Sequence, residues 1–458
     1  MEERCGRLGR LVWLLVVPAL LVPWARDGFG SPADRRVPAR IDIDWLAAKV
    51  EPRVVAWRRD IHEHPELGNR EVRTAALVAE HLRSLGLEVT TGVAHTGVVG
   101  ILRGRSTSPV VALRADMDAL PVKELADVPF ASKVRAPYNG REVDVMHACG
   151  HDAHTAILMG VAEVLSARRE TLPGTVKFMF QPAEDSRPDG EAGGASEMIR
   201  AAVLDQPKVD AIFGLHVGPF PHGTIAYRPQ GAMAGVSVFT ISVTGRQTHG
   251  AMPWAGVDPI PIAAQVILGL QTIVSRQLDL TAAPAVLTIG TLSAGTQNNI
   301  IPAKVEMSGT IRTFAPAARE DVATRIRRTA ESIAQGAGGT AEVSFSDNAT
   351  PVVFNDPSLT ARMVPVLERV AGRDRLVVMP PLTVGEDFAF YQEKVPGLFL
   401  FLGTSALGAD PARVAPNHSP YFTVDDSALV VGVRALSSLA IAYLEDRRRG
   451  DKQSRDRH

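Results

Sequence analysis

Short apolar runs alternate with amphipathic stretches between residues 42 and 232. Apolar residues recur at helical spacing across Trp45–Ile61, Val72–Leu85 and Ala153–Arg168. Compact apolar runs of strand length lie at Gly97–Leu102, Val110–Arg114, Thr175–Phe180 and Ala211–His216. This alternation predicts an α/β domain with a central, mostly parallel sheet. Ligands of such sheets bind beyond the carboxyl ends of the strands, where Asp116, Glu184 and His216 are expected to lie.

A different pattern begins at Met233. Strands are predicted at Val236–Thr244, Ala285–Leu292, Lys304–Phe314 and Ala341–Phe345, with helices at Pro259–Arg276 and Ala317–Gln335. The β-α-β-β-α-β order predicts a ferredoxin-like α+β domain. It is inserted into the first domain, because the α/β pattern resumes with Ser358–Val370, Leu398–Leu402 and Asp425–Leu444.

The predicted domains follow from these patterns. An α/β domain is expected at residues 42–232 and 347–446, an inserted α+β domain at 233–346, and a disordered tail at 447–458. At the other end, three arginines precede an uncharged stretch, Leu11–Ala25, of 15 residues. A membrane span needs about 20 residues, so residues 1–30 are predicted to be a signal peptide cleaved between Ala25 and Ser31. The alternative is an uncleaved membrane anchor. No later segment is expected to cross a bilayer, and we expect a secreted or periplasmic protein.

The composition excludes some functions. The 49 basic and 50 acidic side chains give a net charge of −1, which leaves no electrostatic footprint for nucleic acid. The chain has two cysteines, Cys5 and Cys149. Since Cys5 lies in the predicted signal peptide, the mature chain has no partner for a disulfide. Cys149 is therefore available to a metal.

The run Met146–His154 carries the first candidate chemistry, because Cys149 and His151 lie two residues apart across Gly150. Glycine permits the sharp turn that would let both side chains reach one ion. Thiolate and imidazole are ligands that zinc and similar ions prefer. Taken alone, however, a cysteine near a histidine is more often explained by packing.

Further candidate ligands follow downstream. Glu184 and Asp185 end an apolar strand, where one carboxylate could bind metal and the other take a proton from an activated water. The alternative is a pair of solvated acids at the start of a loop. His216 ends another apolar strand, where a core histidine is the default interpretation. His418 lies in a polar loop before the last helix.

Together these residues form a set of five ligands, which fits two ions better than one, because a single zinc is usually satisfied by four. The set is Cys149, His151, Asp185, His216 and His418. Two divalent cations with one thiolate and one carboxylate keep a surplus of positive charge. Such a centre would polarise a carbonyl group and attract an anionic substrate. Zinc or manganese is expected, and cobalt or nickel also suits this ligand mixture.

The chain resembles the metal-dependent N-acyl-amino-acid amidohydrolases, a group that includes hippurate hydrolase, aminoacylase and indole-acetyl-amino-acid hydrolase. These are relatives of dinuclear-metal carboxypeptidases and dipeptidases. The resemblance extends from Trp57 to Leu444. It is carried by Trp57–His62, Pro65–Gly68, Arg114–Pro121, Cys149–His154, Gln181–Asp185, Gly214–Val217 and Asn417–Phe422.

The resemblance implies a role for each residue of this set. All five candidate ligands match metal-binding positions of the group, and Glu184 matches its general base. Asp116 and Asp118 match acids beside the metal site, where they would orient a ligand. The chain departs from the group at Asp185, where a glutamate is usual. Aspartate is about 1.5 Å shorter in reach, but it keeps an oxygen ligand, so we interpret the change as tuning.

The inserted domain carries the substrate-side residues of the resemblance. His249, in the stretch Thr248–Pro253, matches a histidine that reaches the partner subunit's active site and stabilises the oxyanion. A homodimer is therefore implied. Gln247 and Thr248 replace two glycines of the group. Asn299 and Arg312 match positions that hold the substrate carboxylate. The alternative for Arg312 is a strand arginine in a surface ion pair.

These observations predict a metal-dependent hydrolase of N-acyl amino acids (N-acetyl, N-benzoyl or similar) that releases a carboxylic acid and a free amino acid. A dipeptidase or carboxypeptidase on the same metal centre is the nearer alternative. A binding protein without catalysis on this fold is the more distant one, and retention of Glu184 beside a full ligand set argues against it.

Overall fold

The computed structural model of the chain describes residues 39–281, 284–346 and 349–455. The predicted signal peptide and its membrane-anchor alternative lie outside the described residues. The main sheet of the described part contains eight strands in the order β1-β2-β6-β3-β7-β18-β8-β17. Their bounds are β1 (Glu88–Val93), β2 (Gly97–Arg103), β3 (Val110–Asp116), β6 (Thr175–Gln181), β7 (Ala211–Gly218), β8 (Ile225–Tyr227), β17 (Leu376–Val378) and β18 (Gly397–Gly403).

The centre of this sheet is parallel. Strands β6, β3, β7 and β18 pair in parallel, whereas β1, β2 and β8 add antiparallel pairs towards the edges. Every residue of the four central strands is buried, as expected of parallel strands covered on both faces. The predicted mostly parallel α/β fold is confirmed.

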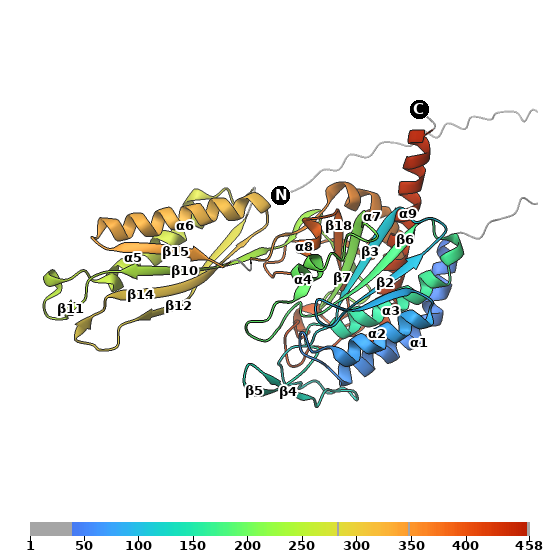
Figure 1. Cartoon of the computed structure of the whole chain (residues 1–458), viewed down its shortest axis with the longest axis horizontal. Coiled ribbons are helices and arrows are strands. Elements are labelled where there is room, and N and C mark those ends of the chain that lie inside the picture. Colours follow the sequence, from blue (N-terminus) through green and yellow to red (C-terminus); the bar gives the residue numbers. More distant parts are fainter. Residues whose placement is uncertain (1–38, 282–283, 347–348, 456–458) are drawn as a thin grey trace, which may run out of the picture. The chain divides into compact units, whose positions relative to one another are not determined.

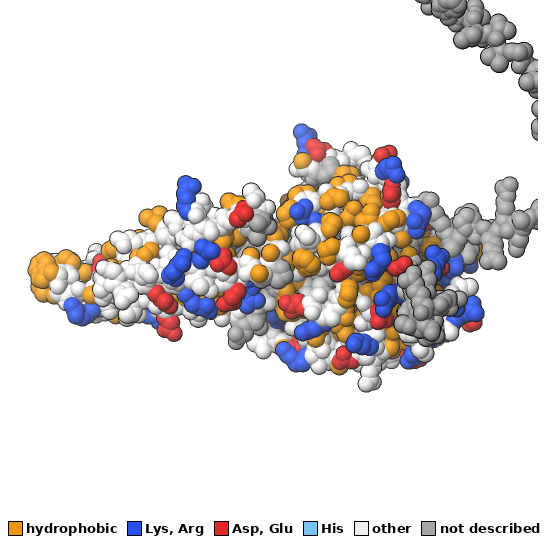
Figure 2. All heavy atoms as spheres, turned by 90° about the horizontal axis from the view of Figure 1, so that it is seen from above, with side chains coloured by type: hydrophobic (Ala, Val, Ile, Leu, Met, Phe, Trp, Pro, Cys, Tyr) orange, Lys and Arg blue, Asp and Glu red, His pale blue; other side chains and the backbone are white. Residues whose placement is uncertain are grey.

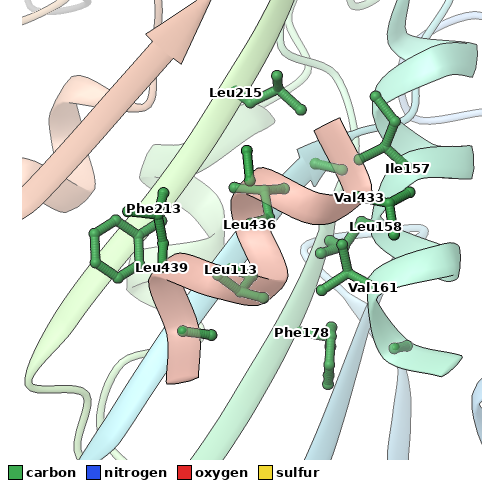
Figure 3. Packing of buried hydrophobic residues seen from close by; sticks show 14 of the residues in the cluster. Leu113, Ile157, Leu158, Val161, Phe178, Phe213, Leu215, Val433, Leu436 and Leu439 are labelled. Atoms are coloured by element: carbon green, nitrogen blue, oxygen red, sulfur yellow. The ribbon is translucent and has the colours of Figure 1, made fainter. Parts of the chain in front are cut away.

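Helices cover both faces of the main sheet. One face carries α1 (Ala39–Glu63), α2 (Val72–Ser84), α3 (His151–Ser166), α7 (Pro357–Ala371) and α9 (Leu429–Arg455). The other face carries α4 (Gly194–Arg200) and α8 (Ala389–Gln392). Figure 3 shows Leu113, Phe178 and Phe213 of the central strands meeting Val161 of α3 and Leu436 of α9. This packing fixes α3, which begins at His151, against the sheet.

The inserted segment forms a second sheet with its own core. In the described residues it has four antiparallel strands in the order β12-β14-β10-β15. Buried and exposed residues alternate along β10, so the sheet has one apolar face, and α5 and α6 cover it (Figure 1). The expected β-α-β-β-α-β order is present. The bounds are β10 (Gly235–Thr244), α5 (Pro259–Thr272), β12 (Ala285–Ala294), β14 (Lys304–Thr313), α6 (Pro316–Gly336) and β15 (Thr340–Phe345).

Three short strand pairs complete the described fold, and none was expected from the sequence. They are β4 (Arg135–Tyr138) with β5 (Arg141–Asp144), β9 (Gln230–Met233) with β16 (Val353–Asn355), and β11 (Thr248–His249) with β13 (Ile300–Ile301). Strands of two to four residues are too short to show a period of two in the sequence.

The C-terminal helix differs from two expectations. It continues to Arg455, whereas a disordered tail was expected from Arg447; the arginines, lysine and glutamine here are good helix formers. The stretch Asp426–Arg449 is also long and apolar enough to cross a membrane, although no such segment was expected. However, 72% of its apolar window is buried, and α9 packs against α1, α3 and α7 as a core helix.

Charged side chains of both signs are interspersed over the face seen in Figure 2. No extended area of basic charge is visible on this face, which agrees with the near-zero net charge.

Candidate metal centre

The candidate ligands gather at one edge of the main sheet. Asp116 ends β3, His216 lies in β7, and Glu184 and Asp185 follow β6. Because β3, β6 and β7 are parallel, their carboxyl ends meet at the same edge. The remaining ligands come from the start of α3 and from the loop before α9.

Gly150 makes the turn between Cys149 and His151. It caps α3 with φ of 94°, a conformation that residues with a Cβ rarely adopt. A Cβ at this position would lie 2.3 Å from Cγ2 of Val217. Only glycine fits here, and the turn brings the thiol and the imidazole to one side, as the sequence spacing predicts.

The structure brings all five candidate ligands together. The sulfur of Cys149 lies 3.4 Å from Nε2 of His216 and 3.3 Å from Nε2 of His418. Oδ2 of Asp185 lies 3.5 Å from Nε2 of His151 and 3.4 Å from Nε2 of His418. Two sets of three have ligand atoms within 4.8 Å of one another: Cys149, His151 and His216, and Cys149, Asp185 and His418. Cys149 belongs to both sets.

The donor atoms of this cluster suit divalent cations. Nε2 of His151 and Oδ2 of Asp185 are buried without a hydrogen-bond partner in the described part of the chain, and such orphaned groups need an explanation. Nδ1 of His216 donates to the carbonyl oxygen of Val217 at 2.7 Å, which leaves the Nε2 lone pair facing the sulfur of Cys149. Thiolate, imidazole and carboxylate groups together suit divalent cations, which these five residues would hold.

The acid–base properties of the cluster also suit a bound cation. Burial raises the pKa of the Cys149 thiol well above its usual value, and the neighbouring Asp185 and Glu184 add to this effect. Burial also lowers the pKa of His216 to about 3, so that its imidazole is neutral. A cation among these groups would favour the thiolate, because positive charge stabilises the deprotonated form.

Asp118 connects the two halves of the cluster. Its carboxylate accepts a hydrogen bond from Nδ1 of His151 at 3.1 Å. It also accepts the backbone N–H groups of Glu184 and Asp185 at 3.0 Å and of Ser186 at 3.2 Å. One buried carboxylate therefore orients both a candidate ligand and the loop that carries Glu184.

Asp116 lies deeper than the candidate ligands. Its carboxylate accepts from Nδ1 of His154 and from the buried guanidinium of Arg114. Burial alone would raise the pKa of Asp116, but Arg114 and the two histidines nearby, His151 and His154, hold it well below its usual value. Asp116 is thus an ionised carboxylate that is already engaged by a cation.

A second group of acids, Glu386 and Asp387, lies beside the carboxyl group of Glu184. Burial raises its pKa well above the usual value, and Glu386, Asp185 and Asp387 raise it further. The guanidinium of Arg114 contacts Glu386 at 3.0 Å and Asp387 at 2.8 Å. Sequence reasoning did not identify Arg114, Glu386 or Asp387. The sequence offers one signal for these acids: Glu386 and Asp387 are adjacent acidic residues, as Glu184 and Asp185 are.

A cavity of about 360 Å³ opens onto the cluster. Cys149, Glu184, Asp185, His216 and His418 lie on its polar side. Apolar side chains form much of the remaining wall: Pro219, Phe220, Met233, Leu382, Val384, Phe401 and Pro416. A polar centre with an apolar wall is the usual character of a small-molecule site.

The substrate-side residues divide into two groups. Nη1 of Arg312 donates to the carbonyl oxygen of Thr383 at 2.7 Å, between the cavity residues Leu382 and Val384. His249 and Asn299 lie together instead, because the N–H of Gly250 donates to the carbonyl oxygen of Asn299 at 2.8 Å. Both are exposed and neither is among the residues that line the cavity.

The parallel sheet, the cluster at its carboxyl edge and the half-buried Glu184 beside it define a metallopeptidase-like hydrolase. Residues 112–442 match the model of Peptidase family M20/M25/M40, and the chain belongs to this family. The recognition made from the sequence motifs is confirmed, as is the prediction of an enzyme.

Similar proteins cover most of the chain. N-acetylcysteine deacetylase of Bacillus subtilis (strain 168) is 40% identical over 395 residues, which are 86% of this chain and 97% of that protein. Thermostable carboxypeptidase 2 of Saccharolobus solfataricus is 40% identical over 397 residues, 86% of this chain and 96% of that protein. The solved YXEP protein of Bacillus subtilis, a dinuclear metal binding peptidase from the M20 family, is 38% identical with a TM-score of 0.72. That likeness covers 87% of this chain and 99% of the solved chain.

Proposed function

We propose that this hydrolase cleaves the amide bond of N-acyl amino acids to give a carboxylic acid and a free amino acid. The observation that carries the proposal is the position of Glu184, whose half-buried carboxyl group lines one cavity together with four of the five convergent metal-ligand side chains. A similar protein that removes an acetyl group from N-acetylcysteine supports the substrate class.

Cys149, His151, Asp185, His216 and His418 would hold two divalent cations, zinc or manganese, with cobalt or nickel as alternatives. The likeness to a dinuclear metal binding peptidase supports the number of ions. When bound, such a pair polarises the amide carbonyl and lowers the pKa of a water molecule.

Glu184 accepts the proton of the attacking water and returns it to the leaving amine. Its burial suits this exchange, because a raised pKa brings the carboxyl group closer to neutral pH. Arg312 binds the substrate carboxylate with the guanidinium nitrogens that do not contact Thr383. Asn299 lies beside His249 outside the cavity of its own chain and assists from the partner subunit. The apolar side chains of the cavity surround the acyl group.

The proposed assembly is a homodimer in which His249 serves the partner subunit and stabilises the oxyanion there. Its exposed position outside the cavity of its own chain is compatible with this role. Exposed apolar side chains on α5 and on the edge strand β12 support an interface. They are Ile260, Leu268, Val286 and Leu292.

A dipeptidase or carboxypeptidase is the second candidate, because a thermostable carboxypeptidase is as similar to this chain as the deacetylase is. Export from the cytoplasm also remains a proposal, which rests on the predicted signal peptide. Sequencing the N-terminus of the mature protein tests it, and a terminus upstream of Ala25 contradicts cleavage.

The test of function is a substrate panel with the purified protein. N-acetyl, N-benzoyl and indole-acetyl amino acids are compared with dipeptides, before and after removal of metals by a chelator. We expect faster turnover of the acyl amino acids, loss of turnover on chelation, and recovery when zinc or manganese is added. Preferential cleavage of dipeptides supports the second candidate, and full turnover after exhaustive chelation contradicts the metal mechanism.

A further inference from the structure

Glu71 is a buried acid outside the candidate ligand set. It directly precedes α2, and its side chain is fully buried. One carboxyl oxygen, Oε1, accepts the backbone N–H of Ala183 at 2.8 Å. The other oxygen accepts the hydroxyl of Thr96. Glu71 thus contacts the residue immediately before Glu184.

Ala183 has an uncommon backbone conformation. Its φ is 51°, in the left-handed region that residues with a Cβ seldom occupy. Such a conformation persists only where the surroundings determine it. The hydrogen bond from Ala183 to Glu71 is one such determinant, and it sets the direction in which the chain enters Glu184.

The segment before α2 lies in close contact with the loop that carries Glu184. A Cβ on Gly68, in the segment before α2, would lie 1.6 Å from the carbonyl oxygen of Ser186. The segment before α2 therefore forms one wall of the loop that carries Glu184. Close contact alone does not satisfy a buried N–H group. Glu71 supplies the acceptor that the N–H group of Ala183 needs.

Four successive backbone N–H groups of this loop donate hydrogen bonds to two buried carboxyl groups. Asp118 receives those of Glu184, Asp185 and Ser186, and Glu71 receives that of Ala183. Asp118 also orients His151. Glu71 makes no contact with a candidate ligand in the described residues, so its effect on the site passes through the loop backbone.

We propose that Glu71 is a positioning residue of the hydrolytic site, which holds Ala183 in its left-handed conformation and so directs Glu184 into the cavity and Asp185 towards His151. This inference rests on the proposed function for its catalytic consequence. Its structural part, the fixing of the loop, can be measured without turnover.

To hold Ala183, residue 71 needs a hydrogen-bond acceptor but not a negative charge. Burial raises the pKa of Glu71 to about 8, and the nearby charge of Asp118 contributes. A neutral glutamine can present its carbonyl oxygen to Ala183 and its amide to Thr96. Glu71→Gln is therefore the conservative variant, and Glu71→Met, which keeps the length but removes both acceptors, is the disruptive one.

Glu66 provides a matched control in the same segment. Its carboxylate accepts the backbone N–H groups of Arg73 and Thr74, both at 2.8 Å, at the start of α2. Glu66→Met thus removes the same kind of hydrogen bond but leaves residues 183–186 untouched. A milder second variant is Thr96→Val, which frees only the other oxygen of Glu71 in case Glu71→Met does not fold.

The experiment measures hydrogen exchange of the peptide that spans residues 181–187, together with metal content, kcat, KM and the pH profile, in the full-length protein. For Glu71→Met we expect exchange at least about tenfold faster and kcat lowered by about 10- to 100-fold with KM little changed, because small misplacements of reacting groups are costly. Glu71→Gln should behave as the parent. Adding Ala183→Gly to Glu71→Met should recover part of kcat, since glycine adopts this φ freely.

Three outcomes decide between the interpretations. If Glu71→Met behaves as Glu66→Met does, with lower stability but unchanged loop exchange and kcat, the positioning role is wrong. Because the hydroxyl of Thr96 holds the carboxyl group of Glu71 in the orientation that reaches Ala183, Thr96→Val should also speed loop exchange, by a smaller factor than Glu71→Met. If Glu71→Met does not fold and Thr96→Val leaves loop exchange unchanged, the role is also contradicted. If the parent protein hydrolyses no substrate, the proposed function is wrong, and the exchange data still decide whether Glu71 fixes the loop.

Discussion

The carboxylate of Asp118 lies 3.1 Å from Nδ1 of His151 and accepts a hydrogen bond from it. This contact leaves Nε2 of His151 as the free lone pair, and Nε2 is the atom that faces Asp185. A ligand histidine held in this way keeps both its tautomer and its orientation. Because the same carboxylate also holds the Glu184 loop, Asp118 links the candidate base to the metal ligands.

Replacement of Asp118 should therefore weaken metal binding. For Asp118→Ala we expect an affinity about 10- to 100-fold lower, the range found for such supporting residues, and a lower kcat from the released loop. Metal content after dialysis against graded chelator concentrations measures the first effect. The exposed Asp127→Ala is the control. Equal metal retention in both variants contradicts the role of Asp118.

Glu184→Gln should separate catalysis from metal binding. The amide cannot accept the proton of the attacking water, and general base catalysis contributes about 10²- to 10⁴-fold. We expect a loss of kcat in that range, while metal content stays at the parent level because Glu184 is not in the five-residue ligand set. Turnover within a few-fold of the parent would remove the proposed mechanism.

The sequence was sufficient where a residue type and its local spacing carry the chemistry. The glycine between Cys149 and His151 predicted a turn, and Gly150 does adopt a positive φ. The strand ending in Glu184 and Asp185 was recognisable because fully buried parallel strands read as apolar runs. These local patterns also identified the order of strands and helices in the inserted domain, whereas β1, β8 and β17 of the main sheet were not predicted.

Contacts between distant segments could not be predicted in this way. Arg114 meets Asp387 across 273 positions of sequence, and Glu71 meets Ala183 across 112. Nothing local to Glu71 distinguishes it from Glu66, which only caps α2. Such pairs depend on how loops pack, so the local pattern around each residue does not show which residues meet.

Arg312 should contribute to binding more than to the chemical step. Its guanidinium is held by the carbonyl oxygen of Thr383 and retains donors for a carboxylate. For Arg312→Met we expect KM to rise by about 10- to 100-fold with a smaller change in kcat, since a charged hydrogen bond contributes about 1.5–3 kcal/mol. The measurement is steady-state kinetics with an acyl amino acid and its amide, which lacks the carboxylate. An equal loss with both substrates contradicts a carboxylate-binding role.

Leu268 tests the proposed dimer. It lies on α5, and its side chain is 70% exposed, so it is available to pack against a partner surface. Leu268→Glu should shift the sedimentation coefficient from dimer to monomer and lower turnover, because His249 could no longer serve a partner. Exposed Leu407→Glu, in a loop after β18, is the control. A parent protein that sediments as a monomer at every concentration contradicts the proposal.

His62 should make folding stability depend on pH. Its ring lies buried between two acids, with Nδ1 at 2.8 Å from Asp152 and Nε2 at 3.0 Å from Glu124. Burial alone lowers the pKa of His62, but the charge of Asp152 and the hydrogen bonds to both acids outweigh burial and the repulsion from Arg58, so the pKa is raised. A raised pKa in the folded state means that protonation stabilises the fold.

The sign of the effect follows from this shift. The stabilisation is fully present below the unfolded value of about 6.5 and is lost as pH rises through the higher folded pKa. We expect the urea midpoint of the parent to fall more steeply above pH 6.5 than that of His62→Gln, which carries no titrating ring. His64→Gln, on the same helix beside the exposed Asp60, should keep the parent's slope. If the urea midpoints of the parent, His62→Gln and His64→Gln all fall equally steeply with rising pH, protonated His62 does not contribute to the stability of this fold.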